Sequence, residues 1–200
     1  MAEAWRLFLQ GGIVMWPLML ALIIAIMILI ERISYYKQIK KEIVSVHTTL
    51  KECHSWEDFL TKLQHLPTYH ISYDLVSVLG KAINRNVLQS RMEDTLASVN
   101  TRMNRGLDWL STIVTMAPLL GLLGTVTGMI GAFRVFGTDA GTPTAITGGV
   151  GEALVATATG LCVAIIALAV HSYFSHKVRI LLTVLEDAFG RSLDLFDRGN

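Results

Sequence analysis

Three stretches of the chain contain no aspartate, glutamate, lysine or arginine. They run from Leu7 to Ile30, from Trp109 to Phe133 and from Ala153 to Ser175, and they hold 24, 25 and 23 residues. A helix needs about 20 predominantly apolar residues to cross the hydrocarbon layer of a membrane. The rest of the chain is too short to bury three such helices inside a soluble protein. The stretches therefore predict three transmembrane helices.

The composition excludes several other classes of protein. Hydrophobic residues make up 52% of the chain and charged residues 16%, whereas about a quarter of an average soluble chain is charged. A net charge of +1 provides no field that would recruit nucleic acid, and the high hydrophobicity excludes intrinsic disorder. Cys53 and Cys162 lie too far apart to indicate a disulfide framework or a zinc site. Motifs of hydrolases, zinc proteases and nucleotide-binding enzymes are absent from the sequence, so we expect neither an enzyme nor a cofactor.

The first stretch is expected to stay in the protein as a membrane anchor. Its apolar run from Ile13 to Ile30 is longer than the core of a signal peptide, and Glu31 and Arg32 follow it directly in place of a cleavage site.

Positive charges indicate how the spans are oriented, because cytoplasmic loops carry an excess of lysine and arginine. The segment 31–108 holds eleven of them, whereas the residues before the first span contain only Arg6 and the outer turn only Arg134. The N-terminus is therefore predicted to lie outside. The expected order is a first span at 7–30, a cytoplasmic helical loop at 31–108, a second span at 109–133, an outer turn at 134–143, a third span at 144–175 and a cytoplasmic C-terminal helix at 176–200.

The cytoplasmic segments show helical periodicity. Apolar residues recur at helical spacing from Trp56 to Leu63, where Pro67 should end the helix. A second series runs from Met92 to Leu110 and leads straight into the second span, interrupted only by Gly106. A third runs from Leu182 to Phe196. Two long helices are thus expected to project below the membrane.

Small residues form a stripe along the second span. At steps of 4, 3, 4 and 3 they fall on one helical face: Ala117, Gly121, Gly124, Gly128 and Gly131. Such stripes allow membrane helices to approach closely, so we predict a packing seam. Pro118 should kink the helix, with Thr115 or Ser111 taking up a freed backbone group.

Glu152 is the outlier of the third span. It precedes an apolar run and follows three glycines. If the helix begins near Thr144, about two turns separate its start from Glu152. A carboxylate at that depth is costly and indicates a functional site, and desolvation would let it exchange protons near neutrality. The alternative is a glutamate simply solvated at the outer interface. The small residues expected on its face are Ala145, Gly148, Gly149, Ala156 and Thr159.

Two strings resemble a known family. TMAPLLGLLGTVTGMIGAF (115–133) and GVGEALVATATGLCVAI (149–165) are similar to the paired signature of the ExbB/TolQ/MotA proton-channel family. The start, GGIVMWPLMLALIIAIMILIERI, resembles the first span of the ExbB and TolQ branches. The three spans and the outside N-terminus also match those branches.

The resemblance implies specific site residues. The family's pore glutamate falls on Glu152, its two accompanying threonines on Thr125 and Thr157, and its second-span proline on Pro118. Thr159 stands where an aliphatic residue is common. It lies nearly in line with Glu152 on a helix, whereas Thr157 lies about 140° away, so Thr159 is a further candidate for the proton pathway. Gly149 stands where a proline is common.

The resemblance also implies an architecture and a task. The expected fold is an all-α integral membrane protein that forms a ring, a pentamer, in the bacterial inner membrane, in contact with lipid. Its pore would hold the membrane helices of a dimeric, single-span ExbD- or TolR-like partner, and proton flow would move that partner to energise a TonB-like or TolA-like protein. The transported ion is a proton. The chain has no second acid at membrane depth, so the partner would supply one. Two alternatives remain, a TolQ-like role in envelope constriction and a scaffold that conducts nothing.

Overall fold

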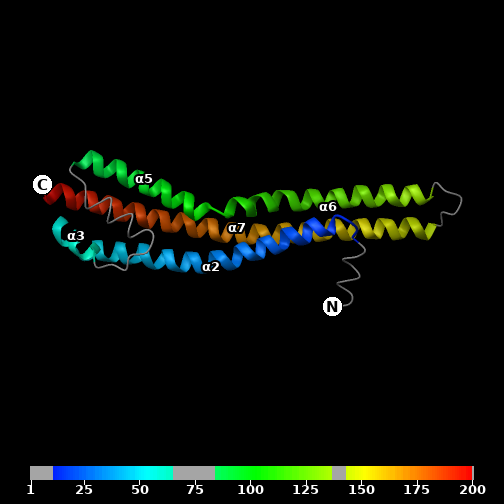
Figure 1. Cartoon of the computed structure of the whole chain (residues 1–200), viewed down its shortest axis with the longest axis horizontal. Coiled ribbons are helices and arrows are strands. Elements are labelled where there is room, and N and C mark those ends of the chain that lie inside the picture. The colour runs from blue at the N-terminus through cyan, green and yellow to red at the C-terminus, as the bar shows by residue number, and fades with distance from the viewer. Residues whose placement is uncertain (1–10, 65–83, 137–142, 200) are drawn as a thin grey trace. The chain divides into compact units, whose positions relative to one another are not determined.

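A computed structural model describes residues 11–64, 84–136 and 143–199. Within these ranges the chain is helical and contains no strand. The helices are α2 (Met15–Glu52), α3 (Trp56–Gln64), α5 (Arg85–Asn104), α6 (Leu107–Phe136) and α7 (Pro143–Gly199) (Figure 1). Pro67, the first four residues of the predicted first span and most of the outer turn lie outside the described residues.

Three of these helices are long and apolar enough to cross a membrane, namely α2, α6 and α7. This confirms the predicted all-α fold with three membrane-spanning helices. Two of them are much longer than the roughly 20 residues that a membrane crossing needs. α7 runs without a break to Gly199, whereas the continuation of α2 to Glu52 has no counterpart in the sequence prediction.

The contacts divide the chain into two units. Unit 1 comprises residues 1–30 and 106–173, and unit 2 comprises residues 31–105 and 174–200. Within unit 1, α6 and α7 lie side by side (Figure 1) and the start of α2 contacts α6, where Val14 approaches Gly124. Leu18 and Ala25 of α2 are buried there as well.

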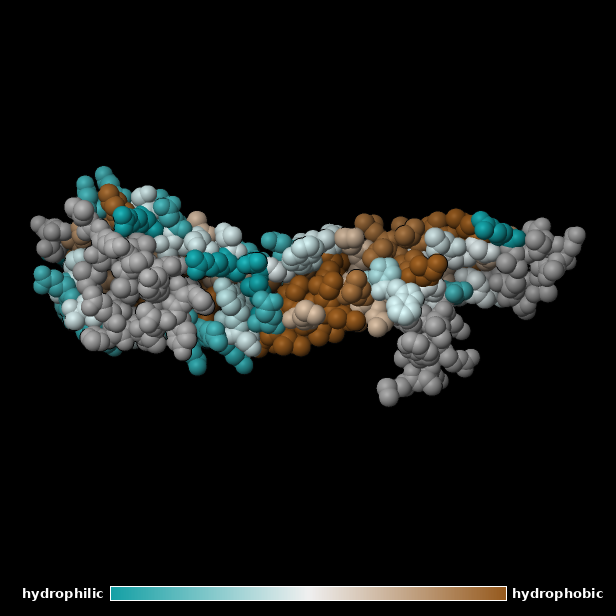
Figure 2. Space-filling model, in the orientation of Figure 1, coloured by the Kyte–Doolittle hydropathy of each residue, from teal (hydrophilic) through white to brown (hydrophobic). Residues whose placement is uncertain are grey.

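The surface of unit 1 is apolar. Among the described residues, almost all exposed large hydrophobic side chains belong to it, including Ile13, Leu119 and Ile165. Figure 2 shows this surface as a brown region over α6 and its neighbours. Burial of apolar groups drives folding in water, so a surface of this kind requires an apolar solvent. Unit 1 is therefore the membrane part of the protein.

Unit 2 is closed by contacts between residues far apart in the chain. The Tyr36 hydroxyl donates to the carbonyl oxygen of Met103 at 2.6 Å, and its ring stacks on Phe174 with the centroids 5.0 Å apart. The Arg32 guanidinium points at the carbonyl oxygens of Arg102 and Met103, both at 3.5 Å. These carbonyls end α5, where a helix has unpaired acceptors and a partial negative charge.

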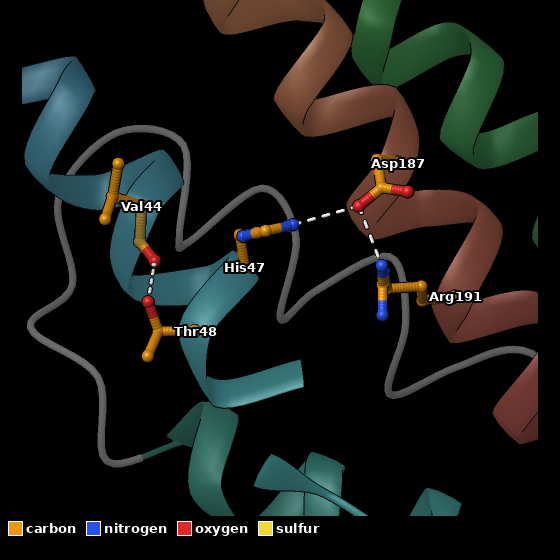
Figure 3. Close-up of polar contacts among 5 residues, drawn as sticks. All are labelled: Val44, His47, Thr48, Asp187 and Arg191. Carbon is orange, nitrogen blue, oxygen red and sulfur yellow. Dashed lines mark hydrogen bonds and ion pairs between the residues drawn. The ribbon is translucent and has the colours of Figure 1, made fainter. Parts of the chain in front are cut away.

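Other polar pairs also join the helices of unit 2. His47 on α2 lies 2.9 Å from a carboxylate oxygen of Asp187 on α7, and Arg191 donates to the same oxygen (Figure 3). Arg85 forms an ion pair with Asp197. The predicted apolar series of the C-terminal helix faces inward, as the burial of Leu185, Phe189 and Phe196 shows.

The junction before the second span differs from the sequence prediction. The apolar series from Met92 to Leu110 was expected to form one helix, but α5 ends at Asn104 and α6 begins at Leu107. Gly106 has a φ of +89°, a left-handed conformation that no continuing helix allows. The apolar residues keep their helical spacing across this turn. Periodicity alone therefore does not reveal that one helix ends here and another begins.

Candidate proton site

The site is built on the contact between α6 and α7, where small residues let two backbones approach. A Cβ atom added to Gly124 would lie 2.6 Å from the Cβ of Ala156, and one added to Gly128 would lie 2.9 Å from the Cβ of Ala153. Ala117 is fully buried. Real side chains do not tolerate such distances, so this face of α6 admits only the smallest residues.

The seam on α6 departs from the predicted stripe at its outer end. A Cβ added to Gly131 would meet nothing within 4 Å, whereas Ala132 is buried against Gly149. Gly131 therefore lies outside the contact between α6 and α7. Two packed helices cross at an angle, so the contact line moves round the helix by a residue over its length.

The matching series on α7 was missed from the sequence. Its members are Gly149, Ala153, Ala156 and Gly160. They are spaced by 4, 3 and 4 residues, the same period as the stripe on α6, so the signal was present. Gly149 and Ala156, which had been placed on the face of Glu152, belong to this series. They lie at the edge of that face, where α6 approaches closely and packs against them.

Pro118 lies within a continuous helix. α6 extends through it from Leu107 to Phe136. Its missing N–H frees the carbonyl oxygen of Val114. The Thr115 hydroxyl donates instead to Thr112 at 2.9 Å and to Ser111 at 3.4 Å, because a threonine side chain on a helix reaches back three or four residues. Thr115 thus does not have the role predicted for it.

Glu152 lies beside the seam, about 70° round α7 from the middle of the series Gly149, Ala153, Ala156 and Gly160. It follows the helix start at Pro143 by nine residues, which is about 14 Å along the axis. Its side chain is exposed in the isolated chain. Next to it, Cβ atoms added to Gly148 or Gly151 would meet nothing within 4 Å. The carboxylate thus stands on an open face made of small residues.

The segment before α2 passes beside this carboxylate. A Cβ atom added to Gly12 would lie 3.9 Å from Oε1 of Glu152. Gly12 has a φ of +70°, which larger residues rarely adopt. The turn that starts α2 therefore comes close to Glu152 because residue 12 is a glycine.

The three candidate threonines differ in where their hydroxyl groups point. Thr125 donates to Leu122 at 2.7 Å and Thr159 donates to Val155 at 2.8 Å, both within their own helices. Thr157 instead donates across the seam to the carbonyl oxygen of Gly121 at 2.9 Å. The structure thus brings Thr157 to α6 and away from the face of Glu152.

No group of three histidine, cysteine, aspartate or glutamate side chains that could hold a metal ion occurs among the described residues. Both cysteines are free thiols. The chemical groups that this site offers are one carboxylate, hydroxyl groups and backbone carbonyls. Such a set can bind and release a proton.

The chain is similar to several known proteins. Residues 61–187 match the model of the MotA/TolQ/ExbB proton channel family. An ExbB-like biopolymer transport protein of Synechocystis sp. is 35% identical over 172 residues, which cover 82% of this chain and 67% of the relative. The biopolymer transport protein ExbB of Xanthomonas campestris pv. campestris is 35% identical over 125 residues, or 61% of this chain and 49% of that protein.

A third relative carries the other branch name. The Tol-Pal system protein TolQ of Haemophilus influenzae is 31% identical over 124 residues, which cover 58% of this chain and 53% of TolQ. The chain thus spans about half to two thirds of the length of these relatives. The family model covers more than half of the chain, including both strings around Pro118 and Glu152. The chain is a member of the MotA/TolQ/ExbB proton channel family.

Proposed function

We propose that the chain is the proton-conducting subunit of a motor in the bacterial inner membrane, with its N-terminus in the periplasm and its C-terminus in the cytoplasm. The observation that carries the proposal is the placement of Glu152. It lies on an open face of small residues on α7, in the apolar unit 1, while the adjacent face of α7 packs on α6.

The open face on α7 supports assembly into a ring, and we propose a pentamer. Five copies of Glu152 around one lumen would repel one another unless most were protonated or neutralised. A lumen lined by glycine and threonine would also leak protons unless an apolar element filled it. A dimeric, single-span ExbD- or TolR-like partner with one acid per helix meets both needs.

The energy available fits this task. Moving one charge through 100 mV yields about 2.3 kcal/mol, so one or two protons can bias a two-state movement of the partner. We propose that this movement energises a TonB-like protein, because relatives named as biopolymer transport proteins match 82% and 61% of the chain.

The test is proton flux into liposomes that contain the chain together with an ExbD- or TolR-like single-span protein. A potassium diffusion potential drives the flux, and a pH-sensitive dye inside the vesicles reports it. Glu152→Gln should reduce the flux to that of liposomes without the partner. Glu186→Gln, which removes an acid in unit 2, should leave it unchanged. Flux that persists in Glu152→Gln contradicts the proposal.

Experiments can distinguish two alternative functions from the proposed one. The similarity to TolQ favours as second candidate an energiser of envelope constriction, in which a TolA-like protein is the final partner. Purification of the complex from its native membrane, followed by identification of the bound TonB-like or TolA-like protein, separates the two. A scaffold that conducts nothing would show no flux with the partner present, even with Glu152 intact.

A further inference from the structure

Thr157 forms a different hydrogen bond from its neighbours on the two helices. Thr127 and Thr159 donate to carbonyl oxygens of their own helices, whereas Thr157 donates to Gly121 on α6. A threonine on a helix always has carbonyl oxygens of its own within reach. The bond across the seam is therefore formed in preference to one inside α7.

The bond exists because residue 121 is a glycine. A Cβ atom added there would lie 3.1 Å from the Cα of Thr157 and 3.2 Å from the carbonyl oxygen of Ala156. Without that atom the backbone of α7 comes close enough for the hydroxyl to reach the Gly121 carbonyl. In an α-helix this carbonyl also accepts from the N–H of residue 125. The backbone N–H of Thr125 and the side-chain hydroxyl of Thr157 therefore both donate to the carbonyl oxygen of Gly121.

The rest of the seam consists of small groups in close contact. Its contacts are methyl groups and glycine backbones, such as Ala156 against Gly124 and Ala153 against Gly128, which set the distance between the helices but form no directional bond. A hydrogen bond has a direction and a fixed length, so one bond across the seam selects one rotation of α7. In membrane proteins such a bond changes an equilibrium constant by about threefold to twentyfold.

The rotation of α7 determines where Glu152 points. Glu152 precedes Thr157 by five residues, which places it about 140° round the helix. With Thr157 held against α6, Glu152 lies on the other flank of the seam, next to the open side at Gly148 and Gly151. A turn of α7 that carries Thr157 away from Gly121 would carry Glu152 toward the seam and off that side.

We propose that Thr157 is a positioning residue, whose hydroxyl group bonds to Gly121 and thereby holds Glu152 on the open face of α7. Thr157 then affects proton transfer through the orientation of Glu152 and carries no proton itself. The inference rests on the proposed function only in taking Glu152 as the proton-binding group.

The test measures the orientation of Glu152 without measuring flux. Membranes that contain the full chain are treated with N,N′-dicyclohexylcarbodiimide, which modifies carboxyl groups, and mass spectrometry quantifies the rate of modification at Glu152. Thr157→Val keeps the shape and removes the donor. We expect it to lower the rate threefold or more, because a turned Glu152 leaves the open space at Gly148 and Gly151. Thr157→Ser keeps the donor and should restore the rate.

Two further variants complete the design. Thr127→Val removes a hydroxyl that bonds within α6 and should leave the rate at Glu152 unchanged. Gly121→Ala should lower it, and adding Thr157→Val to Gly121→Ala should lower it no further, because both changes break the same bond.

A proton relay through Thr157 gives the opposite pattern. Thr157→Val would then reduce proton flux and leave the modification of Glu152 at the wild-type rate, and this result would overturn the inference. The modification rate and the proton flux are separate measurements. Persisting flux in Glu152→Gln would contradict the proposed function, whereas a wild-type modification rate in Thr157→Val would contradict this inference.

Discussion

Gly160 on α7 lies so close to Ala117 on α6 that a Cβ atom added to the glycine would stand 2.6 Å from the carbonyl oxygen of Ala117. The same Cβ would lie 3.0 Å from the Cα of Gly121. Both neighbours are backbone atoms, which cannot rotate away as a side chain can. The two helices are therefore held at a distance that one methyl group would change.

This contact predicts that Gly160→Ala destabilises the protein by about 1–3 kcal/mol, the usual cost of overpacking. Gly190→Ala on the same helix is the matched control. It would meet nothing within 4 Å and should stabilise the helix by up to about 1 kcal/mol. Unfolding in detergent, followed by circular dichroism, measures both. Equal stability of the two variants would contradict the close approach.

Gly128 and Gly131 should respond differently to enlargement. Gly128→Leu places a large side chain against Ala153, which would already lie 2.9 Å from a Cβ, so we expect α6 and α7 to separate and the oligomer to be lost. Gly131→Leu projects into space that the chain leaves open and should leave the fold of the subunit intact. The measurements are circular dichroism for the fold and native mass spectrometry for assembly. Loss of the fold in Gly131→Leu would show that the seam includes Gly131 after all.

The assembled protein is predicted to be a pentamer whose central channel holds lipid or detergent when no partner is present. Glu152→Gln should leave this assembly intact, because an uncharged side chain is at least as stable as a carboxylate in a low-dielectric site. Native mass spectrometry after gentle solubilisation counts the subunits of both proteins. A monomer or dimer in that preparation would refute the prediction.

Asp187 makes the stability of unit 2 depend on pH. Hydrogen bonds from His47 and then Arg191 hold the pKa of Asp187 below its usual range. A lowered pKa favours the folded state above the unfolded pKa, near 3.9, and this contribution is lost as the pH falls through the folded pKa. Asp187→Asn should therefore lower the stability at neutral pH by a small amount that declines as the pH falls below about 4. Asp194→Asn is the control, and denaturant unfolding at several pH values is the measurement. A difference that stays constant down to pH 2 would contradict the pairing.

Tyr36 makes stability depend on pH at the alkaline end. Burial raises its pKa to about 12, whereas an unfolded tyrosine loses its proton near 10. Its contribution is complete below about pH 10 and is lost as the pH rises through 12. Tyr36→Phe should be less stable than the wild type at neutral pH by about 0.5–1.5 kcal/mol, the usual worth of one hydrogen bond, and should lose less stability between pH 10 and 12. Tyr173→Phe, which alters an exposed ring, is the control. The same alkaline loss in Tyr36→Phe as in the wild type would be the contrary result.

Much of this protein is determined by sequence features that act locally. The charge-free stretches predict three membrane-spanning helices because each backbone must bond to itself where water is absent. The glycines of α6 identify a packing face because their spacing follows the helical period. Glu152 is identifiable as a candidate because a carboxylate beside an apolar run is rare whatever it packs against.

The tertiary structure decided the features that depend on two helices at once. The rotation of α7 against α6 assigns Gly149 and Ala156 to the seam, excludes Gly131 from it, and directs the Thr157 hydroxyl to Gly121. A helical pattern leaves this rotation undetermined, since it gives the angle between residues of one helix and says nothing of the angle to its neighbour. The bond of Tyr36 to Met103 likewise joins residues 67 positions apart. Contacts of this kind depend on tertiary packing, so the local periodicity of the sequence does not predict them.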